Sequence, residues 1–93
     1  MERAEILETA MQYVTEDRAA SHGDMERNFD LIGRYWSLHL GVTVTSLDVG
    51  IMMSLLKVAR MQGNPSHMDN YIDCAGYMAC AGEIADGKET ADH

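Results

Sequence analysis

The chain has 93 residues and a net charge of −8, from 15 Asp and Glu against 7 Lys and Arg. This length fits one domain with a thin core, and the charge excludes non-specific binding to nucleic acid, because phosphate contacts need a basic surface. The sequence also lacks a run of about 20 apolar residues for a membrane span, a signal-peptide pattern at its start and enough cysteines for a disulfide scaffold, so we expect a cytoplasmic protein.

Two helices are predicted in the first half of the chain. Apolar residues recur at helical spacing over 2–19 and again over 25–40. We expect Asp24 to cap the start of the second helix with its carboxylate, and Gly41 to end that helix in a left-handed conformation.

A third helix is predicted over 46–62. Thr45 and Asp48 have the spacing of a capping box at its start, and Gly63 follows its end. Its apolar stripe is wide, which predicts that this helix is the most buried one in the fold.

A fourth helix is predicted over 67–86, where Ser66 and Asp69 have the spacing of a second capping box. We expect residues 1–87 to form one domain and 88–93 to be a flexible polar tail. The fold class is therefore all-α, with about four helices in a compact bundle. The eight methionines stand mostly at core spacing, so we expect a methionine-filled core that oligomerisation completes, with a dimer favoured.

Three carboxylates are candidate ligands of Mg²⁺. Asp69 and Asp73 are four residues apart, which places them on one face of a helix, and Asp48 is the third acid. Asp69 and Asp73 would also be the catalytic acids of a hydrolase. A capping role already explains Asp48 and Asp69 without a metal, and Asp73 could instead pair with Lys57 or Arg60, which an antiparallel helix pair would bring close.

Four residues are candidate contacts for a nucleotide. Lys57 and Arg60 stand on a helix with little other charge and could bind phosphates, although surface solvation and pairing with the fourth helix explain them too. Tyr77 could contact a base, and His22 lies in a glycine-containing turn before a helix start, where backbone amides suit an anion. The same turn could be an ordinary connection, since Asp24 would occupy those amides.

The sequence resembles a family of small, uncharacterised phage and prophage proteins over about residues 15–85, and most specifically over 55–77. The residues that carry this resemblance are His22-Gly23-Asp24, Phe29, Trp36, Asp48, Met52-Met53, Leu55-Leu56-Lys57, Ala59-Arg60, Asn64, Asp69-Asn70, Asp73 and Ala75-Gly76-Tyr77. This resemblance implies a viral setting, in which the protein would act in the host cytoplasm.

A looser resemblance is to the MazG-type all-α nucleotide pyrophosphohydrolases, which use helix-borne acids and Mg²⁺ to cleave nucleoside triphosphates. Asp69 and Asp73 are similar to the second half of their motif at a spacing of four rather than three, and the EExxE half is absent. The resemblance implies a nucleotide as ligand and attack of a metal-activated water on a polyphosphate.

Two functions are therefore expected. The first is a small phage protein that binds, and in the enzymatic case hydrolyses, a nucleotide at a Mg²⁺-linked site between the third and fourth helices. The second is a non-enzymatic acidic inhibitor of a basic host defence protein, such as an anti-CRISPR protein, because an acidic surface can occupy a basic channel.

Overall fold

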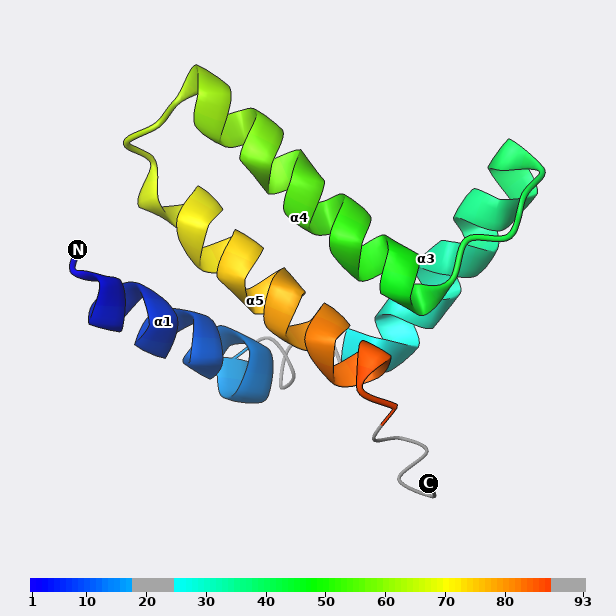
Figure 1. The fold of residues 1–93 in the computed structure, drawn as a ribbon, viewed down its shortest axis with the longest axis horizontal. Helices are drawn as coiled ribbons and strands as arrows, with labels where there is room; N and C mark the ends of the chain where they lie inside the picture. Colours follow the sequence, from blue (N-terminus) through cyan, green and yellow to red (C-terminus); the bar gives the residue numbers. More distant parts are fainter. Residues whose placement is uncertain (18–24, 88–93) are drawn as a thin grey trace.

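The computed structural model of the chain describes residues 1–17 and 25–87. Its elements are α1 (Arg3–Gln12), a π-helical continuation η1 (Tyr13–Asp17), α3 (Met25–Leu40), α4 (Ser46–Gly63) and α5 (Met68–Ala85). All the regular structure in these residues is helical, and the helices pack into one compact unit (Figure 1). The predicted all-α fold with about four helices is confirmed.

The antiparallel pair of α4 and α5 lies at the centre of the fold (Figure 1). The helix α1 packs along the opposite side of α5, and α3 packs against the region where α4 begins and α5 ends. The far half of α3 extends away from this pair, so that α3 and α4 form an open angle. Within the described residues, no helix has the length and apolar character that crossing a bilayer requires.

The start of α4 has the predicted capping box. The Asp48 amide donates to Thr45 Oγ1 at 3.1 Å, and the Thr45 amide donates to Asp48 Oδ2 at 2.9 Å. Two amide groups that lack helical partners are thereby satisfied. Gly41, after the end of α3, has φ +75°, which confirms the predicted left-handed residue.

The predicted capping box at the start of α5 is wrong. His67 is the N-cap residue and its side chain makes no capping bond, so Ser66 lies one position too early to cap the helix. The Ser66 hydroxyl lies 3.5 Å from Asn64 Oδ1, and the Tyr71 hydroxyl donates to the Pro65 carbonyl at 2.7 Å. The turn is therefore held by a tyrosine from the helix.

The first predicted helix is correct in type but not uniform. Regular α-helix ends at Gln12, and the backbone continues as the π-helical η1 through Asp17. The bounds predicted for 25–40 agree with those of α3, whereas the predicted cap at Asp24, the break around 20–23 and the tail 88–93 lie outside the described residues.

Among residues 1–17 and 25–87, the buried apolar core is small and contains no methionine. It consists of Ala10, Phe29, Val49, Ile72 and Ala81. Close approach of the helices explains this composition, since a Cβ atom built on Gly50 would lie 3.0 Å from the Cβ of Ala81 and 3.2 Å from the Phe29 ring. The predicted methionine-filled core is therefore wrong for the single chain, because so narrow a space between the helices has no room for long side chains. Its completion by oligomerisation stays a prediction.

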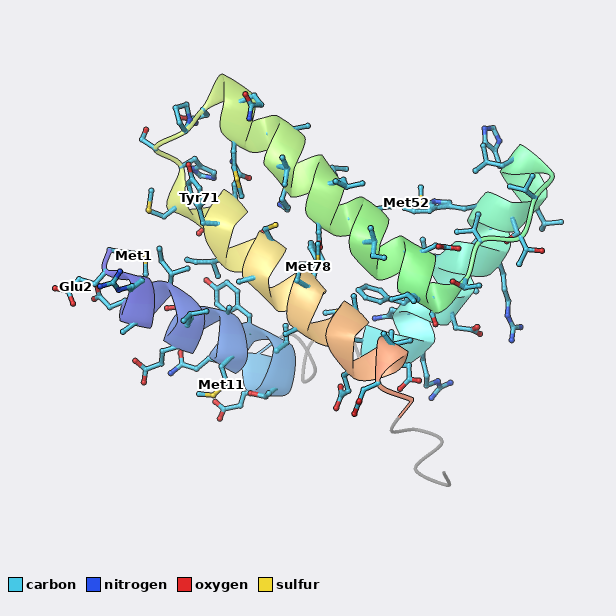
Figure 2. All side chains as sticks on the ribbon, viewed as in Figure 1. Met1, Glu2, Met11, Met52, Tyr71 and Met78 are labelled. Carbon is cyan, nitrogen blue, oxygen red and sulfur yellow. The ribbon has the colours of Figure 1, made fainter. Side chains whose placement is uncertain are left out.

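The prediction that 46–62 forms the most buried helix is also wrong. α5 and α3 each cover one side of α4, and its remaining surface is solvent-exposed although it is rich in apolar side chains. In Figure 2, Met52 lies on the side of α4 toward its open angle with α3, and Met11 lies on the far side of α1, with α5 between α1 and α4.

Candidate functional site

An ion pair joins α4 to α5. Lys57 Nζ lies 3.0 Å from Asp73 Oδ2, and the two side chains are only 16% and 14% exposed. The prediction that an antiparallel pair would bring Lys57 close to Asp73 is confirmed. Asp73 also lines a cavity of about 20 Å³ together with Tyr13 and Tyr77. This cavity has room for about one water molecule, so a nucleotide bound at Asp73 would have to separate the helices or lie outside this cavity.

The three candidate metal ligands are not brought together. Asp48 is occupied in the capping box of α4, and Asp69 faces His67, with 4.0 Å between Oδ2 and Nε2. Lys57, which is paired with Asp73, lies nine positions beyond Asp48, or about 13 Å along the helix axis. Residues 1–17 and 25–87 contain no group of three or more His, Cys, Asp or Glu side chains that could hold a metal ion. The Mg²⁺ site stays a prediction from the sequence.

The remaining nucleotide-contact candidates are dispersed. Arg60 is exposed in the last turn of α4. The Tyr77 ring packs against Phe29, with ring centroids 6.1 Å apart and planes tilted by 41°. His22 lies outside the described residues. The part of the predicted site that the structure assembles is therefore the Lys57–Asp73 pair, with Tyr77 beside the carboxylate.

Cys74 lies beside this pair on α5. Its thiol lies 3.6 Å from the Ser54 carbonyl oxygen and donates a weak hydrogen bond to it, while the Ser54 hydroxyl donates to the Gly50 carbonyl at 2.9 Å. Burial raises the pKa of the Cys74 thiol. A thiol kept in its neutral form has the character of a packing residue rather than of a nucleophile.

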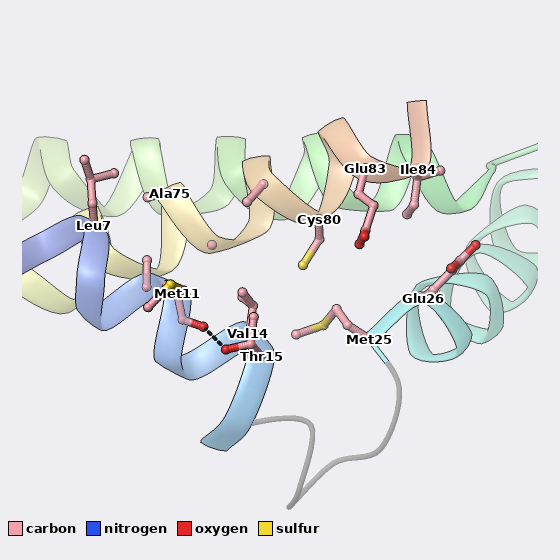
Figure 3. A pocket seen from close by; sticks show the side chains of 13 residues that line it. Leu7, Met11, Val14, Thr15, Met25, Glu26, Ala75, Cys80, Glu83 and Ile84 are labelled. Carbon is pink, nitrogen blue, oxygen red and sulfur yellow. Dashed lines mark hydrogen bonds between the residues drawn. The ribbon is translucent and has the colours of Figure 1, made fainter. Parts of the chain in front are cut away.

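A cavity of about 430 Å³ lies between α1, η1, the start of α3 and α5. Figure 3 shows Leu7 and Met11 at one end and the carboxylates of Glu26 and Glu83 at the other. Its volume is in the range of small-molecule sites. This cavity was not predicted from the sequence. The feature that could have indicated it is the set of small residues at 75–76 and 79 on α5, which leave the space unfilled.

Sequence reasoning also missed an apolar ridge on α3, formed by Leu31, Tyr35 and Leu38. These residues are spaced i, i+4 and i+7, so they align on one side of the helix. All three are exposed, Leu38 by 82% and Tyr35 by 65%. Alongside the ridge, Arg34 and Asp30 form a solvent-exposed ion pair at 3.0 Å. The ridge could have been predicted from this spacing, because a second apolar stripe on the same helix already accounts for the packing of α3.

Residues 5–85 match the family model described as a domain of unknown function (DUF6378). The chain is similar to the Gene 55 protein of Mycobacterium phage L5, with 41% identity over 73 residues that cover 77% of this chain and 47% of that protein. It is also similar to the Gene 55 protein of Mycobacterium phage D29, with 34% identity over 79 residues that cover 85% of this chain and 52% of that protein.

The chain thus spans about half the length of the curated relatives it matches. No solved structure matches it significantly. The resemblance to a phage protein family is confirmed by these relatives, whereas the resemblance to MazG-type enzymes stays a prediction.

Proposed function

The chain belongs to the family described as a domain of unknown function (DUF6378), whose members include phage proteins, and on that premise we propose that it is a non-enzymatic binding module for a host protein. The observation that carries this proposal is the exposed apolar ridge of Leu31, Tyr35 and Leu38 on α3. Helices that insert into a groove of another protein present anchors at this spacing.

The chemistry of the ridge and of the whole chain defines the partner. Two leucines and a tyrosine fit an apolar groove. Tyrosine is favoured at interfaces because it buries a large ring while its hydroxyl stays in contact with water. The net charge of −8 favours a partner with a basic surface around that groove, since opposite charges speed the encounter. If the partner is a host enzyme whose basic surface is a nucleic-acid channel, this chain would inhibit the enzyme by occupying that channel. An anti-defence or anti-CRISPR protein would act in this way.

The proposal is tested with a variant of the ridge and a control variant at an exposed apolar side chain on another helix. Tyr35→Asp with Leu38→Asp places charges on the ridge, and Leu7→Asp places one on α1 at a side chain that is 62% exposed. A tagged chain is used to capture host proteins at two salt concentrations, and the affinity of the captured protein is then measured after purification. We expect the ridge variant to weaken that affinity at least tenfold, Leu7→Asp to leave it unchanged, and salt to reduce it.

Equal binding by the ridge variant and the unmodified chain would remove the ridge as the binding surface. An affinity that does not fall as the salt concentration rises would contradict a partner with a basic surface.

Nucleotide binding is the second candidate, because the Lys57–Asp73 pair sets two little-exposed charges beside Tyr77. If the pair is part of a nucleotide site, Mg²⁺ with one of the nucleoside triphosphates raises the melting temperature. Asp73→Asn abolishes that rise and Asp30→Asn, at an exposed carboxylate on α3, does not. No rise with any nucleotide removes this candidate.

A further inference from the structure

The outer side of α4 is an apolar surface that none of the other described helices covers. We define the α4 outer face by the residues that lie on it: Asp48, Ile51, Met52, Leu55, Val58, Ala59 and Gln62. Leu55, at its centre, is 57% exposed, and Ile51, Met52 and Val58 are exposed as well. α5 and α3 cover other sides of α4, and a contiguous apolar face of this kind on a small domain marks an interaction site.

We propose that the α4 outer face binds the same face of a second copy of this chain, with the two α4 helices antiparallel and Leu55 on the two-fold axis. The spacing on the face supports helix–helix packing. Asp48, Leu55 and Gln62 are seven residues apart, and Ile51 and Val58 are seven apart, which is the repeat that keeps one side of a helix against a partner helix.

A two-fold contact requires a surface that is complementary to itself, and the α4 outer face meets this requirement. When Leu55 lies opposite Leu55 of the second copy in an antiparallel pair, Ile51 faces Ala59 of that copy and Met52 faces its Val58. At each end, the Asp48 carboxylate faces the Gln62 amide, which can donate a hydrogen bond to it. A parallel pair would instead place Asp48 against Asp48, and like charges repel.

The distribution of charge favours α4 over α5 as the surface through which two copies meet. Two chains that each carry −8 repel one another. Along α5 there are three acids and no Lys or Arg, whereas the α4 outer face has Asp48 as its one charged residue. Copies of the chain therefore meet with least repulsion through α4.

The oligomeric state tests the proposal directly. We expect the full chain to have twice the mass of one chain by light scattering after gel filtration, and Leu55→Asp to halve that mass. Leu7→Asp and Tyr35→Asp, which change equally exposed side chains on α1 and α3, should leave the mass doubled. A monomeric unmodified chain overturns the proposal, as does a Leu55→Asp variant that stays dimeric. Tyr35→Asp changes the α3 ridge and leaves α4 unchanged. Host-protein binding through the ridge and dimerisation through α4 are therefore tested independently.

Crosslinking tests the antiparallel arrangement without depending on the folding of a charged variant. In the proposed dimer Leu55→Cys lies next to its own copy, so it should form an intermolecular disulfide at least tenfold faster than Ile51→Cys. Two copies of position 51 are about 12 Å apart along the axis, beyond the roughly 7 Å between Cα atoms that a disulfide spans. The unmodified chain, with Cys74 and Cys80, gives the background rate. Equal crosslinking at 51 and 55 overturns the arrangement.

Discussion

Gly33 on α3 lies so close to the Val44 carbonyl oxygen that a Cβ atom at position 33 would be 2.8 Å from it. Ser37 fixes this contact, because its hydroxyl oxygen accepts a hydrogen bond from the Val44 amide at 2.7 Å and its hydroxyl proton is directed to the carbonyl oxygens of Gly33 at 2.7 Å and Val44 at 3.2 Å. The connection between α3 and α4 thus contacts α3 through backbone atoms, which cannot move aside by a change of rotamer as side-chain atoms can.

Gly33→Ala should therefore lower the free energy of unfolding by about 1–3 kcal/mol, as an overpacked site does. Gly82→Ala is the matched control, since it is also helical and nothing lies within 4 Å of the added atom. It should stabilise the fold by about 0.5–1 kcal/mol through helix propensity. Urea unfolding followed by circular dichroism measures both, and equal effects of the two changes would show that the α3–α4 connection yields easily.

The Lys57–Asp73 pair should be a structural tie between α4 and α5. Lys57→Met removes the ion pair with Asp73 at a little-exposed site, and we expect the free energy of unfolding to fall by about 1–3 kcal/mol. Breaking the exposed pair of Arg34 and Asp30 with Arg34→Met should cost less than about 0.5 kcal/mol.

A double-mutant cycle of Lys57→Met with Asp73→Asn isolates the coupling between the two side chains. We expect a coupling free energy of about 1 kcal/mol or more. A coupling indistinguishable from zero would mean that the pair does not stabilise the fold.

The role of Asp48 can be separated from metal binding. Asp48→Ala and Thr45→Ala remove the two halves of the capping box, and each should lower the free energy of unfolding by about 1 kcal/mol. The loss should be the same in chelator and in excess Mg²⁺, measured by thermal unfolding. A Mg²⁺-dependent rise in melting temperature that Asp48→Ala abolishes and Thr45→Ala retains would instead restore Asp48 as a metal ligand.

Local features of this fold could be predicted from the sequence. The spacing of Thr45 and Asp48 defines a cap whose partners are three residues apart, and Gly41 marks a helix end by its backbone freedom alone. The proximity of Lys57 and Asp73 followed from the short connection between two helices, which fixes an antiparallel pair.

The burial of individual side chains, which depends on how the helices pack against one another, could not be predicted in the same way. Leu55 and Val49 are both apolar residues of α4, yet Val49 is fully buried and Leu55 is more than half exposed. Periodicity shows that both are apolar but not which neighbour lies beside each. The capping box expected at Ser66 failed for a related reason, because the Tyr71 hydroxyl holds the Pro65 carbonyl and the helix begins one residue later.

The reactivity of Cys74 should change when the chain unfolds. Burial raises the pKa of its thiol, so at pH 8 the folded chain has less thiolate at this position than the unfolded chain, and the thiolate is the species that reacts. Alkylation of Cys74 by iodoacetamide, followed by tandem mass spectrometry, should be several-fold slower in the folded protein than in urea. Because the folded state retains the proton, the free energy of unfolding should be unaffected by this group below about pH 8 and should fall as the pH rises above about 8.5. Cys74→Ala should remove that decline, and equal alkylation rates in the folded and unfolded chains would show that the thiol is open to solvent.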